Sequence, residues 1–386
     1  MEVAIPGGAS ARELAELWAA KEFGRAALGD RRRTVRLVAV GVGLAAKPAG
    51  KVTQVFDEDA ARQGAYGILE NAHVTTEGVL RSVCLATADR SREVPFVFVP
   101  TDGSSLTLSD RHALRGLGPV GTDDAVARGL EVMNAIAVRP DGTPLGLCGQ
   151  VWWKREEKPV KRGRRRRGGS RETKRRTKQR AKRKEKRKAL RKLRELEEKE
   201  TRFWIQVVEQ TRQAYRSAGV TTRLWFQLDR GGDFKEMLGY AVDSEDWFTI
   251  RAAQDRRVLG DEGAKLWQTV EGAGVLGTYN LPILGGHKRQ ERVAEMEVRA
   301  SKVTFHLCDR RTPSGWRDVT LSAVLTRERG TPPPGEERIE WLLLTTAPCN
   351  NFADACRVVA GYAQRWRVEQ FHKTWKSTCR VEENEL

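Results

Sequence analysis

Leu224-Trp-Phe-Gln-Leu-Asp229 is a short apolar run that ends in an aspartate, and it decides the fold predicted for this chain. A second run of the same kind, Phe96-Val-Phe-Val99, leads to Asp102. Short runs rich in aromatic and β-branched residues are typical of buried strands. Strand ends on one edge of a sheet can place their carboxylates side by side. We therefore expect the two aspartates to be neighbours.

The last helical pattern of the chain supplies a third carboxylate. It reads Tyr362-Ala-Gln-Arg365-Trp-Arg-Val-Glu369-Gln-Phe-His-Lys-Thr-Trp-Lys376. At about 100° per residue, its phenol, carboxylate and two of its cations fall within roughly a 60° arc of one helix face. Such a face suits a metal-dependent site that works on a phosphate backbone. An amphipathic surface helix, with i,i+4 pairs of Glu369 to Arg365 and Lys373, would show the same pattern.

Two strands that each deliver an aspartate and a late helix that delivers a glutamate describe an α/β fold with a ribonuclease-H-like catalytic core. Around Pro140-Asp141-Gly142, two apolar runs predict a hairpin. Apolar residues alternate with polar ones over much of 240–338, so we expect a β-rich insertion there. We expect Asp233, which also follows Asp229 closely, to cap a helix rather than to join the site.

Residues 1–80 are expected to form a helical domain. Ser10 and Glu13 make a capping box, Gly29 is expected to end the first helix, and Asp30 can cap the second. That second helix opens with a cluster of arginines. Arginines beside a helix N-terminus suit phosphate contacts, although a solvated basic face would look the same. The residues predicted to contact DNA there are Arg32, Arg33 and Arg36.

The net charge of +18 resides in one segment. Residues 154–199 hold 25 Lys and Arg against 7 Glu, which accounts for the whole excess. Nucleic acid is the expected partner of such a segment, and we predict an auxiliary, sequence-independent DNA clamp. The six cysteines are scattered without a C-x2-C pair, so neither a zinc site nor a disulfide framework is indicated. The sequence has neither a long apolar span nor a basic-then-apolar leader pattern.

The spacing Y-x2-R-x3-E-x6-K of the last helix resembles the signature of the insertion-sequence-four family of bacterial DDE cut-and-paste transposases. The resemblance extends to Thr101-Asp102-Gly, to Asp229-Arg-Gly-Gly-Asp233 and to Glu340-Trp341-Leu-Leu-Leu-Thr-Thr-Ala-Pro348. N-terminal stretches, including Gln63-Gly-Ala-Tyr66, match in kind and order. The resemblance thus spans nearly the whole chain, but the family pattern has no counterpart to the basic insertion.

The resemblance implies a site and a cofactor. Asp102, Asp229 and Glu369 would be the catalytic carboxylates and the ligands of two Mg²⁺ ions, with Mn²⁺ as a substitute. Other residues would contact DNA: Arg365 and Lys376 as phosphate clamps, Tyr362 as a hydrogen-bond donor, and Trp341 as a platform for a flipped base. An ordinary core position is the alternative for Trp341.

By this resemblance the chain is expected to be a transposase with a DNA-end-binding domain at 1–80 and a catalytic domain at 81–386. The catalytic domain would be interrupted by the basic insertion at 154–199 and the β-rich insertion at 240–338. The expected partners are transposon ends and target DNA, with a bacterial cytoplasmic, nucleoid-associated setting and no membrane. Family members continue into a C-terminal dimerisation region beyond the point where this sequence stops. A homodimer is expected if that region is supplied, and the alternative function is a truncated, non-catalytic inhibitor of transposition.

Overall fold

The computed structural model describes residues 10–109, 116–121, 127–156, 199–260, 263–286, 290–309 and 311–383. Most of the predicted basic clamp, residues 157–198, lies outside these ranges. The helices are α1 (Ala11–Phe23), α2 (Arg31–Ala46), α3 (Val52–Val55), α4 (Asp59–Leu69), α5 (Thr76–Arg90), α7 (Arg202–Ser217), α8 (Lys235–Asp243), α9 (Leu266–Gly272), α10 (Phe352–Ala363) and α11 (Trp366–Lys373). The strands are β1 (Phe96–Thr107), β2 (Gly118–Pro119), β3 (Arg128–Val138), β4 (Pro144–Trp153), β5 (Arg223–Leu228), β6 (Trp247–Arg251), β7 (Val275–Ile283), β8 (Arg292–Cys308), β9 (Trp316–Glu328) and β10 (Glu340–Thr345).

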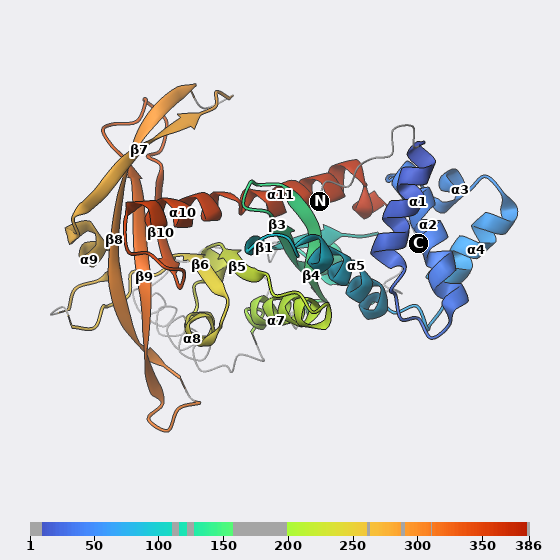
Figure 1. Ribbon diagram of the computed structural model, residues 1–386, viewed down its shortest axis with the longest axis horizontal. Coiled ribbons are helices and arrows are strands. Elements are labelled where there is room, and N and C mark those ends of the chain that lie inside the picture. Colours follow the sequence, from blue (N-terminus) through green and yellow to red (C-terminus); the bar gives the residue numbers. More distant parts are fainter. Residues whose placement is uncertain are drawn as a thin grey trace, which may run out of the picture.

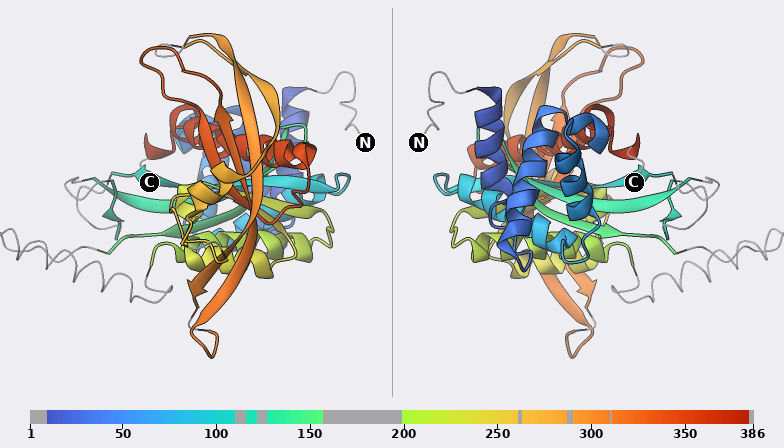
Figure 2. Two further views of the ribbon diagram at one scale, coloured as in Figure 1. Left: turned by 90° about the vertical axis from the view of Figure 1, so that its left-hand side faces the viewer. Right: turned by 90° about the vertical axis from the view of Figure 1, so that its right-hand side faces the viewer.

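The N-terminal part is helical, as the sequence predicts. The capping box of Ser10 and Glu13 starts α1, and the Asp30 carboxylate accepts from the Arg32 amide at the start of α2. The prediction that Gly29 ends the first helix is wrong. Helix α1 stops at Phe23, six residues earlier, and the amide of Gly24 closes its last turn. These helices lie at one end of the molecule, and the long strands β7–β9 lie at the other (Figures 1 and 2).

One sheet organises the rest of the described chain. Its order is β2-β3-β1-β5-β6-β10-β9-β8-β7, and β4 also pairs with β3, on the edge opposite β1. Strand β1 runs antiparallel to β3 and parallel to β5, and β6 continues the parallel set beside β5. Strands β3 and β4 form the hairpin predicted around Pro140-Asp141-Gly142. The parallel pairing of β1 with β5 ends at the pair Thr101–Leu228, directly before the two aspartates.

The two faces of the sheet carry separate apolar cores. In β1, Val97 and Val99 face the core covered by α7 and α8, whereas Phe98 faces the core under α10. Strand β5 alternates in the same way, with Phe226 on the first face and Trp225 on the second. Figure 1 shows α7 and α8 on one side of the sheet and α10 and α11 on the other. By this alternation both aspartates point toward α10 and α11.

The β-rich stretch extends the same sheet and does not form a second one. Strand β6 lies within the predicted insertion of 240–338, yet it pairs with β5 of the core, and β10 joins β6 to β9. The predicted alternation holds, because Ala294, Met296 and Val298 are buried along β8.

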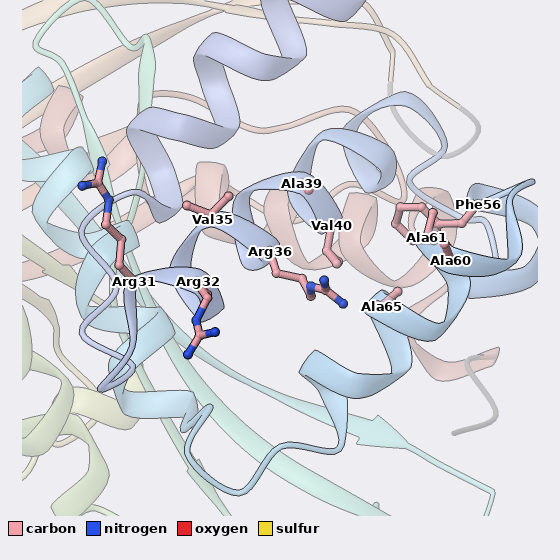
Figure 3. A pocket seen from close by; sticks show the side chains of 11 residues that line it. Arg31, Arg32, Val35, Arg36, Ala39, Val40, Phe56, Ala60, Ala61 and Ala65 are labelled. Carbon is pink, nitrogen blue, oxygen red and sulfur yellow. The ribbon is translucent and has the colours of Figure 1, made fainter.

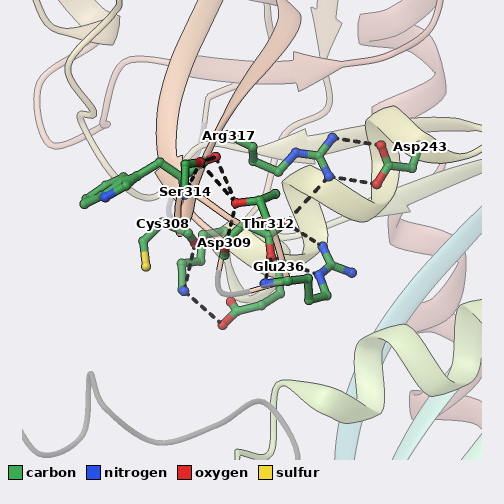
Figure 4. Close-up of polar contacts among 10 residues, drawn as sticks. Glu236, Asp243, Cys308, Asp309, Thr312, Ser314 and Arg317 are labelled. Atoms are coloured by element: carbon green, nitrogen blue, oxygen red, sulfur yellow. Dashed lines mark hydrogen bonds and ion pairs between the residues drawn. The ribbon is translucent and has the colours of Figure 1, made fainter.

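The far turn between β8 and β9 is fastened to α8. Both guanidinium nitrogens of Arg317 donate to the Asp243 carboxylate at 2.8 Å, and Lys235 donates to the Cys308 carbonyl at 2.9 Å (Figure 4). The hydrogen bonds from Arg311 lower the pKa of Asp309 to about 2, so this carboxylate stays charged beside Arg317. These contacts fix the long hairpin to the helical layer on one face of the sheet.

Candidate active site and DNA-binding surface

A row of polar side chains crosses the sheet on its α11 face. Gln150 of β4 lies opposite Asn134 of β3, and Asn134 lies opposite Asp102 of β1. Asp229 follows the last residue of β5, next to Asp102. The sequence predicted that both strands would end at their aspartates. For β1 this is wrong, because β1 continues to Thr107 by pairing with β3 after its pairing with β5 has stopped.

Helix α11 brings Glu369 to the two aspartates. The guanidinium of Arg365 lies between carboxylates, because one nitrogen donates to Asp102 at 3.2 Å and the other donates to Glu369. The Arg365 side chain is only 14% exposed. The structure therefore brings together the three carboxylates and the arginine that the sequence singled out, although Asp102 lies 263 residues before Arg365 in the chain.

The environment of Asp102 disfavours its charge. Burial raises the pKa of its carboxyl group to about 6, with a further contribution from the negative charge of Asp229 and a smaller one from Glu369. The amide of Gly103 and the charge of Arg365 lower this pKa without cancelling the rise. A carboxylate that is costly to ionise beside two others is typical of a functional site.

This pKa predicts that replacing Asp102 with Asn stabilises the chain above pH 6. The folded chain ionises Asp102 less readily than the unfolded chain, whose ordinary pKa is 3.8. Below pH about 4 both states hold the proton, so the substitution does not change the free energy of unfolding. Between pH about 4 and 6 the stabilisation by Asn grows, and above pH 6 it stays constant. Its limit is on the order of 1–3 kcal/mol. Thermal unfolding of D102N in EDTA at several pH values measures this gain.

Asp141→Asn is the matched control for that experiment. The Asp141 carboxylate accepts from the Thr143 amide, which lowers the pKa of Asp141, so Asn at this position should bring no gain at neutral pH. A D102N variant that is no more stable than the unaltered chain at pH 7.5, or that gains most in acid, would contradict the prediction.

The helix predicted over 362–376 is interrupted. Helix α10 ends at Ala363, α11 starts at Trp366, and a π-helical turn spans Thr374–Thr378. Tyr362 lies in α10 and is 3% exposed, and its ring packs edge-on against that of Trp341 with the centroids 5.0 Å apart. The phenol and the indole are thus packed together beside the site.

Lys376 lies in the π-helical turn and reaches back to the sheet. Its ammonium group donates to the Ser105 carbonyl of β1 and lies 3.7 Å from a Glu382 carboxylate oxygen. The turn therefore keeps Lys376 on the same side of the sheet as Glu369, although the regular helix has ended by then. The side chain remains 31% exposed, so it is accessible from solvent.

Asp233 plays a different structural part from the one expected. It does not cap a helix. Its buried carboxylate accepts from the amides of Ala253 and Gln254 and pairs with Arg256. These contacts tie the turn after Asp229 to the loop after β6, and they remove Asp233 from the group of candidate catalytic carboxylates.

The side chains at the site suit a hard divalent cation. Asp102, Asp229 and Glu369 offer oxygen atoms, which Mg²⁺ prefers, and the charges of Asp229 and Glu369 add to the rise that burial causes in the pKa of Asp102. Within the described ranges, no group of three or more His, Cys, Asp and Glu side chains is arranged so that it could hold a metal ion as it stands. In this arrangement the Arg365 guanidinium lies between the carboxylates of Asp102 and Glu369.

The arginines of α2 divide into two groups. Arg31, Arg32 and Arg36 line a pocket of about 650 Å³ between α2 and α4, with Val40 and Ala65 among its apolar walls (Figure 3). Arg33, by contrast, donates to the Leu28 carbonyl at 2.7 Å and so braces the loop before α2. Arg31 was not among the residues predicted to contact DNA. Its position next to Asp30, in the arginine cluster at the start of α2, is the sequence feature that could have indicated its place in the pocket.

The comparison with protein families concerns the N-terminal helical region. Residues 15–74 match the family model described as transposase DNA-binding. The match covers most of α1 and all of α2, α3 and α4, together with the arginine-lined pocket. It supports a DNA-binding transposase with DNA as a partner, and the chain combines this helical region with a mixed α/β sheet domain. Among the described helices, none is sufficiently long and apolar to cross a membrane.

Proposed function

We propose that this chain is a DDE cut-and-paste transposase of the insertion-sequence-four family. One observation carries the proposal: Asp102, Asp229 and the Arg365–Glu369 pair meet on one face of the sheet in a chain whose residues 15–74 match a transposase DNA-binding family. The pattern of strands supports a ribonuclease-H-like core. In the order β4-β3-β1-β5-β6, the first three strands are antiparallel neighbours and the last three are parallel.

In this proposal the N-terminal helices bind the inverted terminal repeats of the element. The exposed guanidinium groups along α2 would contact backbone phosphates, which sets the position of the DNA without reading its bases. The sheet face with the three carboxylates would then receive the phosphodiester at the end of the element. Arg365 and Lys376 supply positive charge beside it. Trp341, which packs on Tyr362, would stack on a base that leaves the duplex near the cut.

Asp102, Asp229 and Glu369 would hold two Mg²⁺ ions, or Mn²⁺ as a substitute. Divalent ions bound there supply charge stabilisation and an activated nucleophile for phosphodiester cleavage. In the first cleavage step water attacks the phosphorus, so a new phosphorus–oxygen bond forms while the bond to the 3′ oxygen breaks and a 3′-hydroxyl is released. That hydroxyl attacks a phosphodiester of the opposite strand and displaces the 3′ oxygen of the flanking DNA, which forms a hairpin. Water then reopens the hairpin before strand transfer into target DNA. We further propose action as a homodimer on paired ends in the bacterial nucleoid.

Cleavage of DNA that carries the element's own ends tests the proposal. The purified chain is incubated with an end fragment in Mg²⁺, in Mn²⁺ or in EDTA, and the products are mapped on denaturing gels. We expect a nick at the end boundary that requires the metal, followed by a hairpin product. Specific binding of the ends without nicking in either metal would overturn the catalytic assignment. It would favour the alternative, a non-catalytic relative that inhibits transposition.

A further inference from the structure

A chain of hydrogen bonds lies beneath the carboxylates. The indole N–H of Trp152 donates to the Gln150 side-chain oxygen at 2.8 Å, and the Gln150 amide donates to the Asn134 Oδ1 at 2.8 Å. Asn134 Nδ2 then lies 2.9 Å from His372 Nε2. Asn134 is 0% exposed and His372 is 9% exposed. This series of hydrogen bonds thus crosses from β4 through β3 to α11 in the interior of the protein.

The donor and acceptor roles in this series of hydrogen bonds are fixed by its first member, the indole of Trp152. An indole N–H can only donate, so the Gln150 oxygen must face it and the Gln150 amide must face Asn134. Asn134 accepts with its oxygen and therefore has only its NH₂ group left for His372. Consequently Nε2 of His372 must accept, which requires a neutral ring with its proton on Nδ1. Burial, together with Lys376, lowers the pKa of His372 to about 4, in agreement with this assignment.

The position of this series of hydrogen bonds connects it to the candidate site. Asn134 lies directly opposite Asp102 across β1 and β3, on the same face of the sheet. His372 lies three residues after Glu369, so the two side chains project from the same side of α11. The hydrogen bond from Asn134 to His372 therefore joins the strand beside Asp102 to the helix that carries Glu369.

We infer that Asn134, Gln150 and His372 are positioning residues that set the distance between Asp102 and Glu369. This inference deepens the proposed function and depends on it. Apolar contacts such as those of Val368, Phe371 and Trp375 pack α11 against the protein but are not directional. A directional chain of buried hydrogen bonds permits one register only, because a shift of α11 would leave the amide of Asn134 unpaired.

The test compares two replacements of His372. The Gln in H372Q keeps an acceptor oxygen near the position of Nε2, whereas the Leu in H372L keeps bulk but offers none. The first readout is the affinity of the DNA-free full chain for Mn²⁺, measured by isothermal titration calorimetry. Groups that orient metal ligands typically contribute 10- to 100-fold to metal affinity or activity. We expect H372L to lose about 10- to 100-fold in Mn²⁺ affinity and in nicking rate, with unchanged affinity for the transposon ends. H372Q should retain most of its Mn²⁺ affinity and of its nicking rate.

Ser91→Ala is the matched control, because it removes a buried hydrogen bond to Tyr215 on the other side of the sheet. It should lower thermal stability without changing Mn²⁺ affinity. If H372L does not fold, N134A provides the second test, with the same expected loss. The inference is overturned if either variant binds Mn²⁺ as the unaltered chain does, or if H372Q loses as much as H372L. An unaltered chain that neither binds Mn²⁺ nor nicks DNA would instead refute the proposed function.

Discussion

Replacing Asp229 with Asn is expected to reduce DNA cleavage by about a hundredfold to a thousandfold while leaving the binding of transposon ends unchanged. The Asp229 carboxylate accepts a hydrogen bond from the Gly231 amide at 2.6 Å, and the side-chain oxygen of Asn can accept the same bond. The turn after β5 should therefore persist. What disappears is one negative charge among the three carboxylates. Losing one preorganised charge-stabilising group in an active site commonly costs roughly 10²–10³ in rate.

The experiment measures nicking of end DNA in Mg²⁺ and end binding in EDTA for the same protein preparations. Asp141→Asn is again the control, because Asp141 also accepts an amide hydrogen bond in a turn but lies in the exposed β3–β4 hairpin. That variant should cleave at the normal rate. Cleavage by D229N within a few fold of the unaltered chain would remove Asp229 from the catalytic set. A loss of end binding in parallel with cleavage would point to misfolding.

Deleting residues 162–188 should produce the second large effect, on the salt dependence of DNA binding. The deletion removes 17 Lys and Arg and two Glu. Each neutralised phosphate contributes about −0.9 to the slope of log affinity against log salt, so the slope should become shallower by several units. At low salt the affinity for random DNA should fall by orders of magnitude. Discrimination between end and random DNA should survive, because it is assigned to residues 15–74.

The described residues on either side of the stretch 157–198 contact each other, so the chain can be rejoined there. Arg155 pairs with Glu200 through two hydrogen bonds of 2.7 and 3.0 Å, and it also pairs with the buried Glu131 of β3. A chain in which 162–188 is replaced by a Gly-Ser segment of equal length separates the loss of charge from the loss of length. An unchanged salt slope in both variants would refute the clamp prediction, and failure of both to fold would indicate a structural role.

Local sequence patterns were sufficient for several secondary elements and for the pair of Arg365 with Glu369. Strand β5 and Asp229 follow from a short apolar run with an aspartate at its end, and the Ser10–Glu13 box starts α1 as expected. The i,i+4 spacing places Arg365 next to Glu369 on any helix, so this pair also required no tertiary information. These features depend on residues that are close in the chain.

Tertiary structure alone decided which of the distant residues meet. The alignment of Asp102 with Asn134 and of Asn134 with Gln150 depends on strand register, which a local pattern does not specify. The same limit applies to Arg33, whose guanidinium is engaged by a backbone carbonyl, and to Asp233, which pairs with Arg256. Both are charged residues near a predicted site, and only packing determined that they serve the fold. The sequence thus determined the chemistry available to this protein, whereas long-range strand pairing determined which groups can act together.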